Sequence, residues 1–402
     1  MGEAKNQLNI EMMKEKIEKM NDEIITWRRH FHQHGELSFK EFATSDFIEK
    51  QLESFGGVEI WRPTKTGVIG KIFGAKPGKT VALRADIDAL PMTELNDLPY
   101  ASDTEGVMHS CGHDGHTAIL LAIAKIFSEM KDEMSGSLVC IFQHAEELPP
   151  GGAIEMVEAG VMEGIDEIYG LHLSSSFPTG TFGIRSGFLT AATDRFDIEV
   201  VGKGGHSAMP ETCVDPIVIG AQIISNLQTI VSRRIKGIEP AVLSVCQIGA
   251  GHAYNIIPNT MTITGSVRTF SRDTRGNMEN MITEISQGIA SAYGAECKVS
   301  YELGYSSVVN DEALTENAEN VMKDWFGKES VLAIDPVMPG EDFSAFTEAT
   351  DCPGCFVEIG TANEALGTTM PHHNPKYLMD EKGLYYGTGF FAGVVFDRLF
   401  SK

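Results

Sequence analysis

The stretch "TVALRADI" (residues 80–87) decides the fold class that we expect, because it is a short apolar run that leaves its strand through an aspartate. Three further runs are equally short and rich in branched apolar residues: "SLVCIFQHA" (137–145), "EIYGLHL" (167–173) and "CFVEIGT" (355–361). Helical patterns lie between or after these runs, over residues 116–131, 152–162 and 380–400. Strands that are apolar on both faces and joined by helices predict an open α/β sheet.

The region of residues 188–302 has a different order of elements. Its strands and helices follow one another as "TDRFDIEVVG", "DPIVIGAQIISNLQTIVSRR", "AVLSVCQIG", "MTITGSVRTF", a helix over 274–293, and "CKVSYEL". This β-α-β-β-α-β order is typical of the ferredoxin-like arrangement. Because the region lies before "CFVEIGT", we expect a smaller domain inserted into a larger one formed by residues 1–187 and 303–402.

The composition fits a large folded protein and argues against several kinds of partner. The chain has 402 residues, of which 42% are hydrophobic, so two or three domains of about 150 residues are expected. The formal net charge of −24 argues against nucleic acids and anionic membrane surfaces. No apolar run approaches the ~20 residues of a membrane span, and the charged N-terminus lacks the apolar core of a signal peptide. Seven cysteines, an odd number, do not resemble a disulfide framework, so we expect a reducing cytoplasm.

Polar side chains gather where the predicted strands end. In open α/β sheets ligands bind beyond the carboxyl ends of the strands. The strands lead to these residues: Asp86 and Asp88, then His144, Glu146 and Glu147, then His172, and after a polar loop His372 and His373. The stretch "MHSCGHDGHTA" (108–118) adds His109, Cys111, His113 and His116 at the N-terminal side of a predicted helix. Segments far apart in the sequence therefore converge on one edge of one sheet.

The residue types at this edge fit a metal site. Imidazole, thiolate and carboxylate are the ligands of zinc and its first-row neighbours. The adjacent pair Glu146 and Glu147 would repel itself unless one member binds a cation and the other acts as a base. Taken singly, several of these residues have an ordinary reading: His109, His144 and His116 as polar loop residues, and Cys111 as a small buried side chain.

Three other cysteines are expected to be structural. Cys352 and Cys355 form a C-x-x-C pattern, which suggests a redox pair. No second C-x-x-C exists, however, and the Pro-Gly between the two cysteines is typical of a turn that enters a strand. Cys140 lies in the middle of a predicted strand and is expected in the core.

A set of motifs resembles a known family along almost the whole chain. The motifs are "RADIDALP", "SCGHDGHTA", "QHAEE", "GLHL", "GKGGHSAMP", "YNIIPN", "SVRTF", "GEDF" and "HHNP". Together they resemble the M20 metallopeptidase/aminoacylase family, and within it the amidohydrolase branch of hippurate hydrolases, N-acetyl amino acid deacetylases and plant auxin-conjugate hydrolases. The resemblance implies a zinc-peptidase-like α/β catalytic domain with an inserted ferredoxin-like lid that dimerises, which gives a homodimer or a tetramer.

The resemblance also implies roles for single residues. Two divalent ions (zinc, manganese or cobalt) would be held by Cys111, His113, Glu147, His172 and His373. His373 is preferred to His372 because the family pattern has its histidine two residues before the proline. Glu146 matches the general base, and Asp88 matches the aspartate that orients the site. Asp86 stands where the peptidase branches have a histidine ligand, so its role stays open.

Residues of the inserted domain are implied to bind the substrate. His206 of "GKGGHSAMP" matches a donor to the oxyanion, in its own subunit or in the neighbouring one. Asn255 and Arg268 are implied to bind the substrate's α-carboxylate, which suits arginine geometrically. An ion pair on the strand face is the alternative for Arg268.

The expected function is hydrolysis of the amide bond of N-acyl amino acids, with N-acetyl or N-aroyl groups, by a metal-dependent enzyme. A dipeptidase or carboxypeptidase of the same family is the alternative, because both cleave an amide beside a free carboxylate. A non-catalytic metal-binding scaffold is a third reading, against which the intact Glu146 argues.

Overall fold

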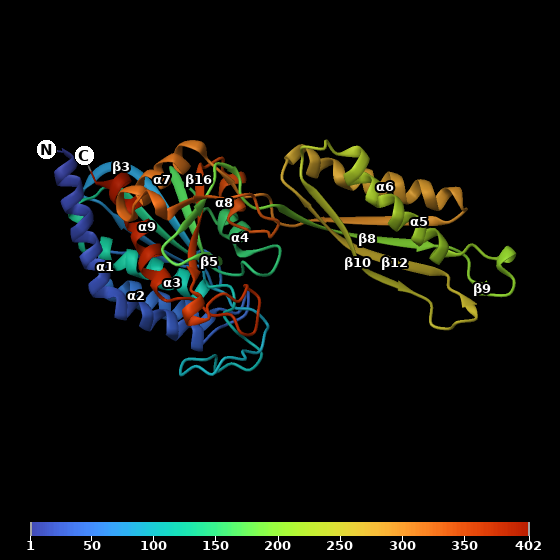
Figure 1. Cartoon of the computed structure of the whole chain (residues 1–402), viewed down its shortest axis with the longest axis horizontal. Helices are drawn as coiled ribbons and strands as arrows, with labels where there is room; N and C mark the ends of the chain where they lie inside the picture. The colour runs from blue at the N-terminus through green and yellow to red at the C-terminus, as the bar shows by residue number, and fades with distance from the viewer. Residues whose placement is uncertain (1, 401–402) are drawn as a thin grey trace. The chain divides into compact units, whose positions relative to one another are not determined.

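The chain forms two compact units in a computed structural model, which describes residues 2–400 and their side chains from residue 9 onward. The first unit holds the described residues up to Leu189, together with Val309–Asp335 and those from Asp342 onward. The second unit holds Thr190–Val308 and Pro336–Glu341. Figure 1 shows the helices and strands of each unit. Within residues 2–400, none of the helices combines the length and apolar character that crossing a bilayer requires.

The first unit is built on an eight-stranded sheet with the order β1-β2-β4-β3-β5-β16-β6-β15. Its strands are β1 (Glu59–Trp61), β2 (Val68–Phe73), β3 (Lys76–Asp86), β4 (Ser135–Gln143), β5 (Glu167–Pro178), β6 (Phe182–Ile184), β15 (Val331–Ala333) and β16 (Gly354–Ala362). The four central strands β4, β3, β5 and β16 are parallel, whereas β1, β2 and β6 add antiparallel pairs. The expected α/β sheet is therefore confirmed, and its parallel centre contains all four predicted strands. A separate short pair joins β7 (Gly187–Phe188) to β14 (Val309–Asn310).

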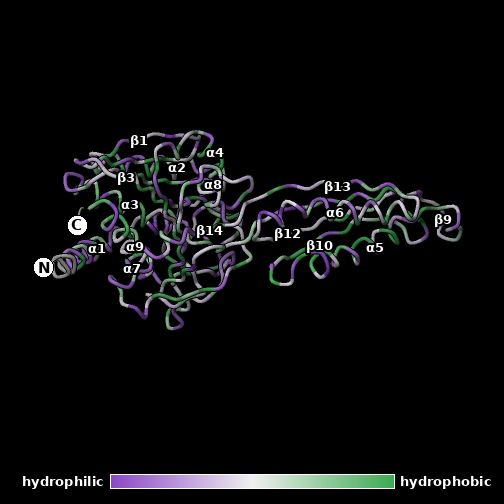
Figure 2. Tube along the Cα trace, turned by 90° about the horizontal axis from the view of Figure 1, so that it is seen from above, coloured by the Kyte–Doolittle hydropathy of each residue, from purple (hydrophilic) through white to green (hydrophobic). Residues whose placement is uncertain are grey.

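The second unit contains a four-stranded antiparallel sheet. Its main elements are β8 (Ala192–Val201), α5 (Pro216–Thr229), β10 (Ala241–Ala250), β12 (Thr260–Thr269), α6 (Arg272–Ala292) and β13 (Glu296–Leu303). The strand order β10-β12-β8-β13 is the one that a ferredoxin-like β-α-β-β-α-β unit gives. Alternate residues of β8 and β12 are buried, and they pack with α5 and α6 in one apolar cluster. Figure 2 traces the backbone of these elements, coloured by hydropathy. A short pair of strands, β9 (Gly205–His206) and β11 (Ile256–Ile257), completes the unit.

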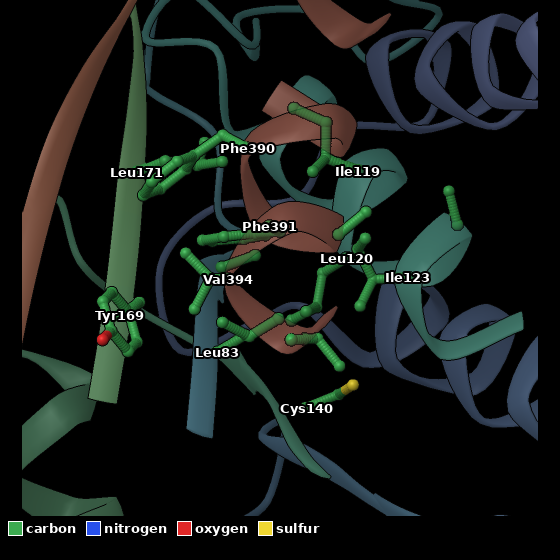
Figure 3. Packing of buried hydrophobic residues seen from close by; sticks show 14 of the residues in the cluster. Leu83, Ile119, Leu120, Ile123, Cys140, Tyr169, Leu171, Phe390, Phe391 and Val394 are labelled. Atoms are coloured by element: carbon green, nitrogen blue, oxygen red, sulfur yellow. The ribbon is translucent and has the colours of Figure 1, made fainter. Parts of the chain in front are cut away.

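The helices of the first unit bury the large sheet. They are α1 (Gly2–Gln33), α2 (Phe42–Phe55), α3 (His113–Glu129), α4 (Gly152–Glu158), α7 (Glu312–Phe326), α8 (Ser344–Glu348) and α9 (Lys382–Leu399). Helix α3 packs against α1, α2 and α9, and nearly all of its residues are buried. Figure 3 shows part of this core. These buried side chains belong to one hydrophobic cluster: Ile119, Leu120, Ile123, Leu83, Leu171, Phe390, Phe391 and Val394. Each such side chain contributes about 1.5–3 kcal/mol of burial free energy, which fixes α3 and the residues at its start.

The helix predicted over 116–131 begins earlier than expected. It starts at His113, directly after Gly112, whose φ of 99° is a left-handed conformation that glycine adopts without strain. His116 therefore lies inside a buried helix, and its reading as a polar loop residue is wrong. The cysteines fit their structural reading: all seven are free thiols, and Cys140, Cys352 and Cys355 are buried.

Candidate metal centre and active site

The predicted ligands come from four segments of the first unit and meet at one place. Cys111 precedes α3, His113 opens it, and His172 lies in β5. Glu147 follows β4, and His373 lies in the loop before α9. Their donor atoms form overlapping groups in which all atoms lie within 4.8 Å of one another: Cys111 with Glu147 and His373, His113 with Glu146 and Glu147, and Cys111 with His172 and His372.

The distances between single donor atoms suit shared cations. The Cys111 Sγ lies 3.4 Å from the His172 Nε2. The Glu147 Oε1 lies 3.2 Å from the His373 Nε2 and 3.9 Å from the His113 Nε2. First-row ions bind nitrogen and oxygen donors at about 2.0–2.2 Å and sulfur at about 2.3 Å, so donors of one ion are spaced in this range.

Two of these atoms provide a direct test of whether a metal fits. The His113 Nε2 and the Glu147 Oε1 are both buried and form no hydrogen bond within the described part of the chain. Leaving a buried polar atom unpaired is costly, and a cation between the two atoms would satisfy both. Burial, and then the charges of Glu147 and Glu146, raise the pKa of the Cys111 thiol well above its usual range. A cation is therefore what would hold Cys111 as a thiolate, and the residues fit a metal.

Asp88 fixes the ring of His113. The carboxylate lies 3.1 Å from the His113 Nδ1, and the backbone oxygen of Asp88 lies 3.0 Å from the same nitrogen. Asp88 also accepts hydrogen bonds from the Ser38 hydroxyl (2.7 Å) and from the Glu147 backbone N–H (3.0 Å). Burial acts to raise the pKa of Asp88, but the hydrogen bond and the charge of His113 outweigh it and lower that pKa. With Nδ1 occupied by Asp88, the His113 Nε2 is left to face the other donors.

Both oxygens of Asp86 have hydrogen-bond partners, and its Oδ2 also lies 3.6 Å from the His113 Nε2. Its Oδ1 lies 2.6 Å from the His116 Nδ1, and its Oδ2 accepts a 2.7 Å hydrogen bond from Arg84. The His116 Nε2 accepts the backbone N–H of Leu173 at 2.8 Å, so the neutral His116 carries its proton on Nδ1 and donates to Asp86. Burial acts to raise the pKa of Asp86, but His113, His116 and Arg84 hold it well below its usual range.

Glu146 lies beside the donors, in one group with His113 and Glu147. Its side chain is almost fully buried, and its Oε2 lies 4.0 Å from the His113 Nε2. The residue before it, Ala145, has a φ of 52°, which is unusual for a side chain other than glycine. This bend follows β4 and presents both glutamates at the carboxyl end of the parallel strands.

The two neighbouring histidines after the polar loop have different partners. The His373 Nε2 faces Glu147, and its backbone N–H donates to the Ser110 oxygen at 2.9 Å. The His372 Nε2 instead accepts the Ser175 backbone N–H at 3.4 Å. Burial, and then the nearby histidines, lower the pKa of His372 to about 3. His373 thus has the free ring nitrogen beside a donor, which favours it as the ligand.

The predicted substrate residues all lie in the second unit. The exposed His206 accepts the Ala208 backbone N–H on Nδ1 at 3.1 Å, so its neutral ring carries a proton on Nε2 and can donate it. The Asn255 backbone oxygen accepts the Ser207 N–H at 3.2 Å, which makes His206 and Asn255 close neighbours. Arg268 lies on β12, and in the part of the chain that the structure describes its guanidinium forms a hydrogen bond to the Val267 oxygen and no ion pair.

A buried network below the site was missed by the sequence reasoning. Arg84 donates to Asp342 at 2.8 Å and to Gln143 at 2.7 Å, and the Gln143 amide donates to Asp342 at 2.7 Å. Burial raises the pKa of Asp342 to about 6, against the lowering effect of Arg84 and Gln143. The network ties the end of β3 to the end of β4. Its members lie in the motifs "RADIDALP", "QHAEE" and "GEDF", which contain Arg84, Gln143 and Asp342, but the motifs gave these residues no role.

Known proteins are similar to this chain along most of its length. The model of peptidase family M20/M25/M40 matches residues 82–397. An N-acyl-L-amino acid amidohydrolase of Geobacillus stearothermophilus is 50% identical over 303 residues, which are 74% of this chain and 82% of the relative. Thermostable carboxypeptidase 1 of Saccharolobus solfataricus is 41% identical over 381 residues, which are 94% of this chain and 96% of the relative.

The likeness extends to a solved structure. The YXEP protein of Bacillus subtilis, described as a dinuclear metal binding peptidase from the M20 family, has a TM-score of 0.82 at 35% identity. The match covers 94% of this chain and 98% of that chain. The family model spans far more than half of the chain, and the donor residues lie inside the matched range. The chain therefore belongs to peptidase family M20/M25/M40.

Proposed function

We propose that this protein is a metal-dependent amidohydrolase that cleaves the amide bond of N-acyl amino acids into a carboxylate and a free amino acid. The observation that carries the proposal is the placement of Glu146 beside a group of metal-ligand donors, two of whose buried atoms form no hydrogen bond within residues 9–400. The 50% identity to an N-acyl-L-amino acid amidohydrolase supports the same substrate class.

Different residues of the chain have different roles in the proposed hydrolysis. Two divalent ions (zinc, manganese or cobalt) held by Cys111, His113, Glu147, His172 and His373 would acidify a water and polarise the amide carbonyl. Glu146 takes a proton from the attacking water as the new C–O bond forms. It then delivers that proton to the amine nitrogen as the C–N bond breaks. Asp88 keeps His113 oriented throughout.

Residues of the second unit are proposed to bind the rest of the substrate. His206, with its proton on Nε2, stabilises the oxyanion, an effect of typically about 2.7–4 kcal/mol per donor. Asn255 and Arg268 bind the α-carboxylate, since the Arg268 guanidinium has no competing carboxylate among the described residues. We infer that His206 serves the site of the partner subunit in a dimer.

The second unit also offers the surface for that dimer. β10 is an edge strand of ten residues whose Val242 and Ile248 side chains are exposed, and Ile217 and Val218 of α5 are exposed as well. A long edge strand with apolar side chains is a template for pairing with another strand. We propose that a second copy of this chain covers it, and that the protein works in the cytoplasm, where its free thiols stay reduced. Light scattering coupled to size exclusion should give at least twice the monomer mass.

A carboxypeptidase or dipeptidase activity is the competing function, favoured by the 41% identity to a carboxypeptidase. Both substrate classes present a free carboxylate next to the scissile amide. The test is amine release from N-acetylmethionine, hippurate and glycine dipeptides, each with added Mn²⁺, Co²⁺ or Zn²⁺. We expect release from the N-acyl substrates. Faster release from the dipeptides would replace the proposal with the peptidase, and no release on any substrate would favour a metal-binding scaffold.

A further inference from the structure

Glu41 is a fully buried carboxylate, 0% exposed, that does not belong to the metal donors. It lies directly before α2, and one of its oxygens, Oε1, accepts two backbone N–H groups. The first comes from Phe39, at 2.9 Å, and the second from Ala145, at 2.8 Å. The Glu41 oxygen thus joins its own turn to Ala145, which lies 104 residues further along the sequence.

Both N–H donors are residues in a strained conformation. Phe39 has a φ of 64° and Ala145 a φ of 52°, and neither is a glycine. Side chains other than glycine are disfavoured in this left-handed region, so such turns persist only where their surroundings hold them. The Glu41 carboxylate is the group that holds the backbone N–H of each.

Each of the two turns leads directly to the active site. Ala145 immediately precedes Glu146. Phe39 immediately follows Ser38, whose hydroxyl donates to Asp88 at 2.7 Å, and Asp88 accepts the backbone N–H of Glu147 at 3.0 Å. The Glu146–Glu147 segment is therefore anchored at both ends through groups that depend on Glu41.

We propose that Glu41 is a positioning residue, which holds the turns at Phe39 and Ala145 and thereby sets the place of the Glu146 carboxylate. This inference rests on the proposed function of Glu146 as general base. The Glu41 Oε1 binds backbone N–H groups and not the metal donors, so we expect its effect on the rate of the chemical step and not on metal content. Misplacing a reacting group by about 1 Å lowers a rate roughly 10²-fold.

Two substitutions at Glu41 separate the roles of hydrogen bonding and charge. Burial, and then the charge of Asp88, raise the pKa of Glu41 to about 7, so a neutral side chain of the same shape is a fair replacement. Glu41→Gln keeps an oxygen acceptor and should keep most of the kcat. Glu41→Ala removes the acceptor and should lower kcat roughly 10- to 100-fold, with the KM and the metal content of the wild type.

A second change tests the strain directly. Adding Ala145→Gly to Glu41→Ala should recover part of the lost kcat, because glycine adopts a positive φ without a clash of its own side chain. A cavity effect of Glu41→Ala would not be relieved in this way. The matched control is Leu52→Ala, which removes a fully buried side chain from α2 without touching the Glu41 carboxylate, and which should lower Tm while kcat is unchanged.

Amide hydrogen exchange provides a readout that needs no activity. Exchange in the peptide that covers residues 144–147 should be faster in Glu41→Ala than in Glu41→Gln or Leu52→Ala. Unchanged exchange there, a wild-type kcat in Glu41→Ala, or a Glu41→Gln variant as slow as Glu41→Ala would each overturn the inference. If the wild type cleaves no N-acyl substrate, the proposed function fails, whereas the exchange experiment still decides whether Glu41 holds the segment.

Discussion

Glu146 and Glu147 are neighbours in the sequence, and both carboxylates face His113, at 4.0 Å and 3.9 Å from its Nε2. The Glu147 Oε1 is buried, forms no hydrogen bond among the described residues and also lies 3.2 Å from the His373 Nε2. A carboxylate between two imidazoles is suited to bind a cation, which leaves the neighbouring Glu146 to move a proton.

This difference predicts opposite results for two matched substitutions. Glu146→Gln should keep both ions and lose roughly 10²–10⁴-fold in kcat, because the base is removed and the ligands stay. Glu147→Gln should lose metal together with activity. Metal content by elemental analysis, beside kcat on an N-acyl substrate, measures both effects. Metal loss in Glu146→Gln with retention in Glu147→Gln would exchange the two roles.

His116 is predicted to support a ligand through the backbone. Its Nε2 accepts the N–H of Leu173, the residue after His172, while its Nδ1 donates to Asp86. His116→Ala should therefore weaken metal affinity by roughly 10–100-fold, the usual effect of removing a group that orients a ligand. Competition with a metal chelator measures it. A wild-type affinity would show that His172 is held without His116.

At the scale of elements, the joint between α1 and α3 depends on a buried ion pair. The Arg28 Nε lies 2.9 Å from the Asp114 Oδ2, and the two side chains are 1% and 0% exposed. His32 adds a contact of 2.8 Å to the same carboxylate oxygen. Asp114 follows His113 in the first turn of α3, so this joint also fixes the start of the helix that carries the proposed ligand His113.

Replacing one member of this ion pair should lower the free energy of unfolding more than replacing both members. Arg28→Met leaves the buried Asp114 carboxylate without its arginine partner and should lower the free energy of unfolding by about 3–5 kcal/mol. The double variant Arg28→Met/Asp114→Leu should recover part of that loss, because it removes both charges of the pair. Urea unfolding measures all three proteins. A double variant less stable than Arg28→Met would contradict the expectation.

The same pair predicts a pH dependence of stability. Burial acts to raise the pKa of Asp114, but Arg28 and His32 outweigh it and hold that pKa well below its usual range. A carboxyl with a depressed pKa in the folded state stabilises the fold above the unfolded pKa of about 3.9. That contribution is lost as the pH falls below about 4, so Asp114→Asn should show a flatter loss of stability in acid than the wild type.

Elements that are buried on both faces were predictable, and those that depend on distant partners were not. The four central strands matched their apolar runs because a parallel strand covered by helices must be apolar on both sides. The first turn of α3 was missed because Gly112, Asp114 and Gly115 are residues typical of turns. Only burial against α1 and α9 makes that segment helical.

The candidate site was also predictable only in part, because some of its residues act through partners far along the chain. A metal site could be expected because histidine, cysteine and glutamate at one sheet edge have few other uses together, whereas the ligand set itself was implied by the family resemblance. Glu41, Arg84 and Asp342 were not found, since a buried carboxylate or guanidinium acts through partners far along the chain. A local sequence pattern does not indicate which backbone N–H or which charged group such a side chain will contact in the folded protein.

At the scale of the whole molecule, the proposed sharing of active sites can be tested without knowing how the two units are arranged. Glu146 belongs to the first unit and His206 to the second. His206→Ala should bind metal normally and lose roughly 10²–10³-fold in rate, the effect of losing an oxyanion donor. Metal loss in this variant would contradict a role limited to the substrate.

The decisive measurement combines two inactive variants of the same chain. If His206 serves the site of the partner subunit, a mixed dimer of His206→Ala and Glu146→Gln contains one site in which both residues are intact. Activity should then return when the two proteins are dissociated reversibly and reassociated together, up to about a quarter of the wild-type rate for random pairing, since half of the dimers are mixed and each has one of two sites intact. Reassociating each variant alone is the control. If subunit exchange is demonstrated and no activity returns, His206 acts within its own chain, because no mixed dimer then combines His206 with Glu146 in one site.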